Sequence, residues 1–289
     1  MIPPQFEYVK PSTISEAIAL LQQHGDDAKV LSGGQSLIPM MKLRLARPAW
    51  LIDINGVPGL GGIREEAGYL RIGGLVRESE IEASALIRAK YPIIHDTARV
   101  IADPLVRNLA TAGGNLAHGD PANDHPATML ALGAEVVATG PKGTRVIHID
   151  DFFVSIFTTA LEPAEILTEI RIPIPPPSSG GAYFKLERKV GDFATAGVAA
   201  QVTVDGNGVC QRAGIGLTNV GPTPLRAKNA EAALRGKKLD SAAIGQAAQL
   251  AAAESQPSSD LRGPEEYKRG LVKELTKRAL MRALERARR

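Results

Sequence analysis

Two short segments, each built around adjacent glycines, constrain this chain more than any other feature. Residues 32–36 read Ser-Gly-Gly-Gln-Ser, and residues 111–115 read Thr-Ala-Gly-Gly-Asn. A Gly-Gly step permits backbone conformations with positive φ and lets another group approach the main chain closely. Successive backbone N–H groups can then converge on one point and form a nest for an anion. Two such segments, with hydroxyl and amide side chains at matching positions, predict a ligand with two linked phosphates.

Other nucleotide-binding motifs are not found. No G-x-G-x-x-G sequence follows a strand-like run, and no G-x-x-x-x-G-K-[ST] sequence occurs. Either glycine segment alone is also compatible with a tight turn that binds nothing. The potential metal ligands between residues 118 and 125 lack zinc-type spacing and are interrupted by proline, so no metal site is expected. No catalytic constellation stands out, and the chain is expected to hold a ligand rather than to attack one.

The composition of the chain excludes further classes of function. Cys210 is the only cysteine among 289 residues, which excludes an internal disulfide and a cysteine-ligated iron–sulfur cluster held by this chain alone. No apolar run is long enough to span a membrane, and residues 1–7 do not resemble a signal peptide, so a cytoplasmic protein is expected. The basic excess gathers in residues 267–289, and few aromatic residues accompany it. Nucleic-acid binding is therefore not expected. A helix with a solvated or partner-facing basic face is expected instead.

Periodicity and turn residues predict an α+β protein. Helices are expected at 12–24, 37–45, 226–235, 240–254 and 264–288, with two more within 77–102. Strands are expected at 28–31 and 50–54, as a hairpin within 60–76, across 127–175, and as an antiparallel pair at 196–204 and 210–218. The Pro- and Ser/Gly-rich stretch 173–181 is the clearest linker. It predicts a domain of residues 1–176, with subdomains of about 1–58 and 59–176, and a second domain of residues 177–289.

Several motifs together carry a family resemblance over essentially the whole length. They are residues 32–39, residues 111–115 with the following Asp120-Pro121, and the stretches 165–167, 185–189, 191–196 and 216–220. With these motifs the chain resembles the FAD-binding medium subunit of molybdenum hydroxylases, the family of carbon monoxide dehydrogenase and xanthine dehydrogenase. The resemblance implies a vanillyl-alcohol-oxidase-like fold. Two subdomains would clasp FAD, and a separate C-terminal domain would combine an antiparallel sheet with a helical bundle.

The resemblance also implies the cofactor site. Both glycine segments would wrap the pyrophosphate through backbone amides, and Ser36 and Thr111 would add hydroxyls. Asp124 would contact the ribityl or adenosine part, Leu167 would bind through its main chain, and Lys185 would lie near the isoalloxazine. The full set is Ser32, Gly33, Gly34, Gln35, Ser36, Ile101, Thr111, Ala112, Gly113, Gly114, Asn115, Asp124, Leu167, Lys185 and Phe193.

At three of these positions the chain differs from some relatives. Phe193 stands where some of them have Tyr, and Ile101 stands where xanthine-oxidising relatives place an aromatic ring. Gln35 replaces a His that is frequent in carbon monoxide dehydrogenases. The resemblance therefore assigns no hydroxylase substrate.

By the same resemblance, the chain is an oxidoreductase subunit. A large molybdopterin-binding subunit and a small [2Fe–2S] subunit would be its partners, in a dimer of heterotrimers. Electrons from a substrate oxidised at molybdenum would pass through two [2Fe–2S] clusters to FAD, and then to NAD⁺, a quinone, a carrier protein or O₂. Two alternatives stay open: a self-contained FAD-dependent oxidase or reductase, and a flavin-free assembly subunit.

Overall fold

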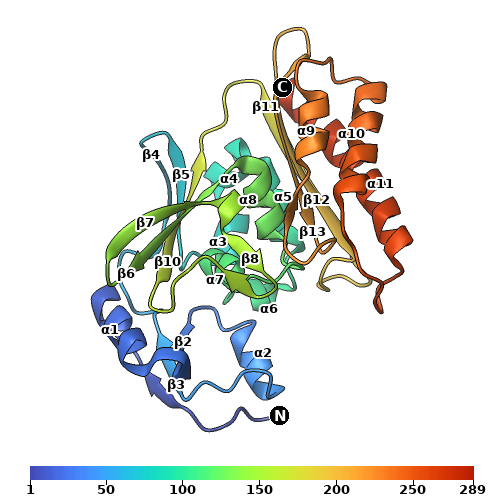
Figure 1. Ribbon diagram of the computed structural model, residues 1–289. Coiled ribbons are helices and arrows are strands. Elements are labelled where there is room, and N and C mark those ends of the chain that lie inside the picture. Colours follow the sequence, from blue (N-terminus) through green and yellow to red (C-terminus); the bar gives the residue numbers. More distant parts are fainter.

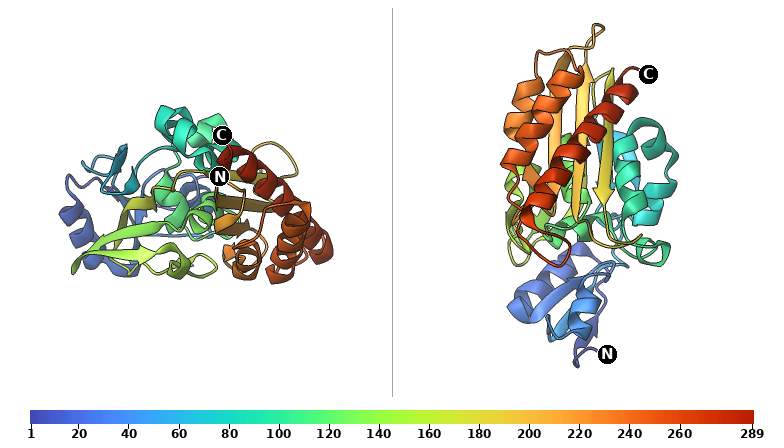
Figure 2. Two further views of the ribbon diagram at one scale, coloured as in Figure 1. Left: turned by 90° about the horizontal axis from the view of Figure 1, so that it is seen from above. Right: turned by 90° about the vertical axis from the view of Figure 1, so that its right-hand side faces the viewer.

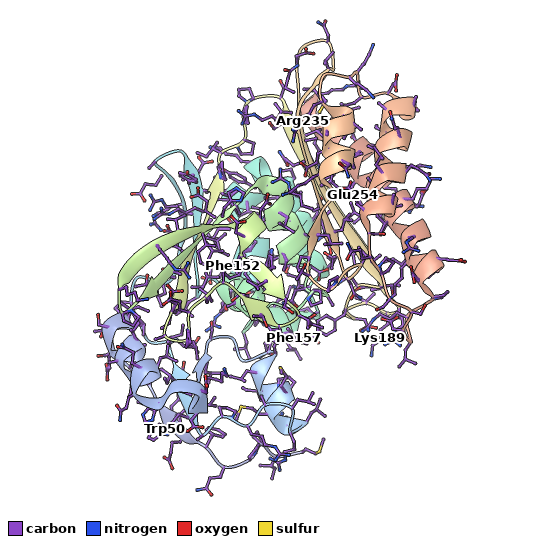
Figure 3. The ribbon with its side chains drawn as sticks, viewed as in Figure 1. Trp50, Phe152, Phe157, Lys189, Arg235 and Glu254 are labelled. Carbon is purple, nitrogen blue, oxygen red and sulfur yellow. The ribbon has the colours of Figure 1, made fainter.

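A computed structural model describes residues 1–289. Three regions follow one another along the chain (Figure 1, and Figure 3 with side chains): an N-terminal lobe (residues 1–58), a middle domain (59–176) and a C-terminal domain (177–289). The N-terminal lobe projects from one end of the molecule, as the right-hand view of Figure 2 also shows. These regions use the domain boundaries predicted from the sequence, which stay a prediction.

The N-terminal lobe is a small parallel sheet with two helices. Its elements are β1 (Glu7–Val9), α1 (Ile14–His24), β2 (Ala28–Leu31), α2 (Leu37–Lys42) and β3 (Trp50–Asp53). The strand order is β1-β3-β2, with both pairs parallel. Helix α1 begins at its predicted cap, where the Thr13 hydroxyl accepts from the Glu16 N–H at 3.1 Å. The apolar face of α1, with Ile18 and Leu21, packs on Ile52 of β3 in a small core that also includes Leu60 and Ile166 of the middle domain.

The middle domain combines a five-stranded antiparallel sheet with six helices. The sheet has the order β4 (Ile63–Glu66), β5 (Tyr69–Gly73), β10 (Ile166–Pro173), β6 (Glu135–Gly140) and β7 (Gly143–His148). A short pair, β8 (Phe153–Ser155) and β9 (Thr158–Thr159), lies beside it. The helices are α3 (Glu78–Ala83), α4 (Ala85–Lys90), α5 (Pro92–Val100), α6 (Pro104–Arg107), α7 (Ala112–Ala117) and α8 (His125–Leu132).

Two expectations for this region are wrong. Residues 77–102 form three helices instead of two, because Ser84 caps a new helix and Pro92 begins another. The stretch from 127 was expected to be strand, but α8 extends to Leu132. Nearly every side chain of α8 is buried, so its sequence is apolar on all sides and lacks the helical periodicity that sequence analysis depends on.

The C-terminal domain is a four-stranded antiparallel sheet with three helices on one face. Its elements are β11 (Ser179–Leu186), β12 (Ala196–Val204), β13 (Cys210–Thr218), β14 (Leu225–Arg226), α9 (Lys228–Leu234), α10 (Ser241–Glu254) and α11 (Glu265–Ala287). The predicted pairing of residues 196–204 with 210–218 is confirmed. The predicted linker is shorter than expected, since its last residues already belong to β11.

The C-terminal sheet is covered on both faces. Helices α9–α11 cover one face, and α5 and α8 of the middle domain contact the other. Gly214 and Gly216 permit this second contact, because a Cβ at either position would collide with a carbonyl oxygen of α8. Helix α11 also supplies Leu280 and Leu284 to the core, so the basic terminal helix is part of the fold as well as a candidate partner surface. None of the helices has the length and apolar character needed to cross a membrane.

Candidate functional site

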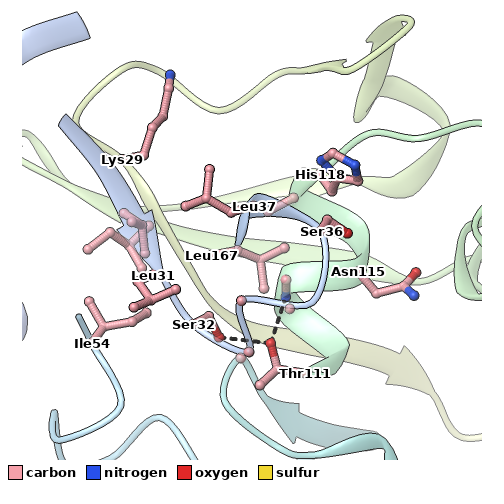
Figure 4. A pocket seen from close by; sticks show the side chains of 18 of the residues that line it. Lys29, Leu31, Ser32, Ser36, Leu37, Ile54, Thr111, Asn115, His118 and Leu167 are labelled. Atoms are coloured by element: carbon pink, nitrogen blue, oxygen red, sulfur yellow. Dashed lines mark hydrogen bonds between the residues drawn. The ribbon is translucent and has the colours of Figure 1, made fainter. Parts of the chain in front are cut away.

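A cavity of about 340 Å³ lies between the N-terminal lobe and the middle domain (Figure 4). Both glycine segments line it, together with the start of β10. The predicted residues found in its wall are Ser32, Gly33, Gly34, Gln35, Ser36, Thr111, Gly113, Gly114, Asn115 and Leu167. Segments that are far apart in the sequence thus meet at one cavity.

The first glycine segment connects β2 to α2 and offers unused backbone donors. Gly34 has a φ of 72°, a conformation that glycine adopts without strain. The backbone N–H groups of residues 33–36 donate to no acceptor in the protein. The only internal hydrogen bond of the turn is from Gln35 Nε2 to the Gly33 carbonyl, at 3.2 Å. Consecutive free donors at a cavity wall fit an anionic oxygen-rich group.

The second glycine segment is the first turn of helix α7, not a loop. Thr111 is the N-cap, and its hydroxyl accepts from the Gly114 N–H at 3.1 Å. The same hydroxyl lies 2.8 Å from the Ser32 hydroxyl of the first segment, as the dashed lines in Figure 4 show. Thr111 therefore caps its own helix and links the two segments.

Most backbone amides of the second segment are already used within the protein. The N–H groups of Ala112, Gly113 and Asn115 donate to Val76 O at 3.0 Å, Gly74 O at 3.1 Å and Thr111 O at 2.9 Å, respectively. With the Gly114 N–H held by Thr111, no amide of residues 112–115 is free. The expectation that this segment wraps a pyrophosphate through backbone amides stays a prediction; in this structure the amides are bonded within the protein, and the segment presents side chains and a close backbone surface.

Asn115 supplies a polar atom that lacks a partner. Its side-chain Oδ1 is buried at the cavity wall and makes no hydrogen bond within the protein. Its carbonyl is held by Asn123 Nδ2 at 2.8 Å. Because an unsatisfied buried polar group is costly, this position calls for a ligand with hydrogen-bonding groups. The residues present therefore fit a nucleotide with phosphate and hydroxyl groups.

Part of the cavity wall was not predicted from the sequence. Apolar residues of several segments line the cavity as well, among them Leu21, Val30, Leu31, Ile54, Pro163 and Ile166. In Figure 4, Leu31 and Ile54 lie on the opposite side from Asn115 and His118. Burial lowers the pKa of His118, so its imidazole is neutral at pH 7. The strand expected at 28–31 was the sequence signal nearest to the apolar side, and such a strand is equally compatible with an ordinary protein core.

The remaining predicted residues lie outside this cavity. Ala112 and Ile101 are buried, and Phe193 is half-exposed on the loop between β11 and β12. Asp124 and Lys185, in contrast, come together: Lys185 Nζ donates to Asp124 Oδ2 at 3.0 Å and to the Val100 carbonyl at 2.7 Å.

Asp124 is the centre of a buried polar cluster at the junction with the C-terminal sheet. The Tyr183 hydroxyl donates to Asp124 Oδ1 at 2.6 Å. Burial raises the pKa of Asp124, and the charge of Lys185 opposes that rise. Asp124 follows Asn123, which lines the cavity, so the cluster adjoins the cavity wall without being part of it.

A second buried pair, His125 and Glu78, lies next to this cluster. His125 Nε2 lies 2.7 Å from Glu78 Oε2, and neither side chain is exposed. Burial opposes the imidazolium, but attraction and hydrogen bonding to Glu78 outweigh it, so the pKa of His125 is raised. His125 Nδ1 and Glu78 Oε1 are buried without partners. This pair ties the start of α8 to the start of α3 behind the second glycine segment.

Two family models together match nearly the whole chain. The FAD binding domain in molybdopterin dehydrogenase matches residues 4–175, and the CO dehydrogenase flavoprotein C-terminal domain matches residues 181–283. The chain belongs to this flavoprotein family. The family and the fold class expected from the sequence are thereby confirmed.

Individual relatives agree with this assignment. The carbon monoxide dehydrogenase medium chain of Hydrogenophaga pseudoflava is 47% identical over 97% of both chains. The 6-hydroxypseudooxynicotine dehydrogenase complex subunit alpha of Paenarthrobacter nicotinovorans is 39% identical over 100% of this chain and 97% of its own. A solved structure of carbon monoxide dehydrogenase from Hydrogenophaga pseudoflava superimposes with a TM-score of 0.96, at 48% identity and 99% coverage of both chains.

These matches also decide the type of protein. The chain is an FAD-binding medium subunit of the molybdenum hydroxylase class and a component of an oxidoreductase complex. Because relatives of similar length oxidise different substrates by their names, this chain does not identify the substrate.

Proposed function

We propose that the cavity between the N-terminal lobe and the middle domain holds the FAD, with its diphosphate against the first glycine segment. The observation that carries this proposal is the row of unused N–H groups at residues 33–36. A diphosphate supplies the oxygen acceptors that these donors lack. Ser32, Ser36 and Thr111 add hydroxyl groups to the same wall.

Other residues complete the proposed site. Asn115 Oδ1 accepts a hydrogen bond from a ligand hydroxyl. The apolar side of the cavity, around Leu31 and Ile54, excludes water from a ring of the ligand. The Asp124–Lys185 pair, with Ile101 and Phe193, borders the part of the ligand that leaves the cavity toward the C-terminal domain. When bound, FAD supplies a redox centre that accepts electrons singly and releases them singly or in pairs. The protein binds and orients this group and controls access to it.

The partners belong to the same proposal. A large subunit that binds the molybdenum cofactor and a small [2Fe–2S] subunit complete the complex, as a dimer of heterotrimers. The relatives' names, "medium chain" and "complex subunit", support a multi-subunit assembly. With no cysteine besides the buried Cys210, the iron–sulfur clusters must be held by a partner. A cytoplasmic location is likewise proposed and is tested by cell fractionation.

An absorption spectrum tests this function directly. We would purify the full chain alone, with added FAD, and co-expressed with the subunits encoded beside it. Flavin absorbance in the complex, with FAD released on denaturation and iron–sulfur absorbance present only with partners, is the expected result. An assembled complex without flavin would favour the assembly-subunit alternative. Turnover of a small substrate by the isolated chain would favour the self-contained oxidase.

A further inference from the structure

The N-terminal lobe is held to the rest of the protein by very few polar contacts. No strand pairing and no ion pair joins residues 1–58 to residues 59–289. Only two hydrogen bonds cross between them, both between side chains. One joins Ser32 to Thr111 at the cavity wall, and the other joins Asn55 to Arg77. Neither Asn55 nor Arg77 lines the cavity.

Arg77 is fixed on the middle-domain side. Its backbone pairs with Thr111 in an isolated antiparallel bridge, and its N–H donates to Glu80 Oε2 at 2.7 Å. One guanidinium nitrogen donates to the Leu109 carbonyl, and the other donates to Asn55 Oδ1 at 2.6 Å. A planar guanidinium serves two acceptors at once in a fixed geometry, which a lysine ammonium on a flexible stem does not.

Asn55 completes the connection on the side of the lobe. Its Nδ2 donates to the Ser32 carbonyl at 2.9 Å and to Asp53 Oδ1 at 2.6 Å. Its Oδ1 accepts from Arg77, so both ends of the amide are used. The first glycine segment is therefore connected, from Ser32 through Asn55 and Arg77, to the residue two positions before Thr111.

We propose that Asn55 and Arg77 form a clasp that sets the spacing of the two glycine segments, and thereby the affinity for FAD, without touching the ligand. This inference rests on the proposed function. Both residues are positioning residues: they act through Ser32 and Leu109. The small core around Ile18 and Ile52 also includes Leu60 and Ile166 of the middle domain, so apolar packing keeps the lobe folded and attached when the clasp is lost. Loss of the clasp then changes how the glycine segment of the lobe sits on the middle domain.

Conservative variants separate the clasp from a general effect on folding. Arg77→Lys keeps the charge but replaces the planar fork by an ammonium on a flexible stem, which does not hold both acceptors in a fixed geometry. Asn55→Asp keeps the shape and the acceptor for Arg77, but it removes the donor to Ser32 and places a carboxylate beside Asp53. Arg64→Ala is the matched control, because Arg64 pairs with Glu66 and Glu169 inside the middle domain.

The measurement is FAD affinity in the co-expressed complex, with the unfolding midpoint recorded with and without FAD. We expect Arg77→Lys and Asn55→Asp each to raise the FAD dissociation constant about tenfold, which corresponds to the loss of one or two hydrogen bonds. Both variants should reduce the rise in midpoint that FAD produces, while Arg64→Ala changes neither. The double variant Asn55→Ala/Arg77→Ala should bind FAD no more weakly than the weaker of the single variants Asn55→Ala and Arg77→Ala.

Two results would overturn the clasp: FAD affinity of the wild-type level in both conservative variants, or fully additive losses in the double variant. Wild-type complex that takes up no FAD would overturn the proposed function itself, and the clasp with it. The wild-type sample thus distinguishes the two failures.

Discussion

The two glycine segments look alike in the sequence but have different structural roles. In residues 33–36 the backbone N–H groups are free, whereas in residues 112–115 every N–H is already bound within the protein. The first segment belongs to a lobe joined to the rest by two hydrogen bonds, and the second begins a helix packed into the middle domain.

The glycines differ in the same way. Gly34 adopts a positive φ that shapes a turn, while Gly113 has an ordinary helical backbone pressed against the Gly74 backbone. The adjacent glycines therefore have two different roles. In the first segment they leave backbone donors free for a ligand, and in the second they allow two backbones to approach closely. Substitution of Gly113 should first damage the framework, whereas substitutions in the first segment should first damage binding.

The largest expected effect is that of Gly114→Val, which should abolish FAD binding. Gly114 is not left-handed, so the reason is steric. A Cβ there would lie 2.7 Å from Thr111 Oγ1. The Thr111 hydroxyl would be displaced, so that it could no longer cap α7 or contact Ser32. The methyl groups of the valine would enter the cavity. The FAD content of the purified complex tests this, with Gly245→Val in α10, where a Cβ meets nothing within 4 Å, as the control. Stoichiometric flavin in Gly114→Val would mean that this segment is not at the site.

Gly113→Ala should destabilise the fold itself. The added Cβ would lie 2.5 Å from the Gly74 carbonyl oxygen and 2.8 Å from Gly74 Cα, and neither backbone atom can move alone. We expect the free energy of unfolding to fall by about 3 kcal/mol, which is at the upper end of the usual cost of overpacking a buried site. Urea unfolding without FAD measures it. Gly270→Ala in α11, where a Cβ meets nothing, should instead be neutral or stabilising by up to about 1 kcal/mol. Equal stabilities of the two variants would refute the close-approach argument.

Gly33→Ala should weaken FAD binding while the protein stays folded. Its Cβ would collide with the Leu109 carbonyl oxygen and lie 2.7 Å from Ala110 Cα, across the boundary between lobe and middle domain. Because only two hydrogen bonds and the apolar packing around Leu60 and Ile166 hold the lobe, a small shift of the lobe can relieve the collision. We expect the FAD dissociation constant to rise at least tenfold, about 1.4 kcal/mol, with an unfolding midpoint close to wild type in the absence of FAD. Gly61→Ala, in open space, is the control. A large loss of apo stability would show that the lobe is rigidly attached.

Sequence patterns predicted the elements whose signals are local. The helix α1 carries a cap, the β12–β13 hairpin carries a turn, and the long helix α11 has an alanine-rich sequence; each forms as expected. Both glycine segments were also found, since adjacent glycines with small polar neighbours are a local signal.

What the sequence did not predict depends on tertiary contacts. Helix α8 is buried on all sides, so its pattern carried no period. The use of the amides in α7 depends on Val76 and Gly74, which are distant in the sequence. Asn55 and Arg77 belong to no motif, and only the fold brings these surface polar residues together.

The smallest expected effect is a difference in how the two regions respond to pH. On the lobe side, burial opposes the Asp53 carboxylate, but hydrogen bonds from Tyr8 and Asn55 outweigh it and lower the pKa of Asp53. Its contribution to stability is therefore complete above the ordinary aspartate pKa, near 4, and is lost as the pH falls below that value. Behind the second segment, the raised pKa of His125 acts in the opposite direction. Its contribution is complete below the ordinary histidine pKa, near 6.5, and is lost as the pH rises through the higher value in the folded protein.

Unfolding free energies of the FAD-free chain across the pH range test this contrast. Relative to wild type, His125→Gln should lose most stability at pH 6 and progressively less toward pH 9, because the wild type then loses its ion pair with Glu78. Asp53→Asn should differ from wild type by a constant amount above pH 5 and by less in acid. A His125→Gln difference that does not change with pH would mean that His125 is neutral in the folded protein. The second segment would then be supported by packing and an uncharged hydrogen bond rather than by a buried ion pair.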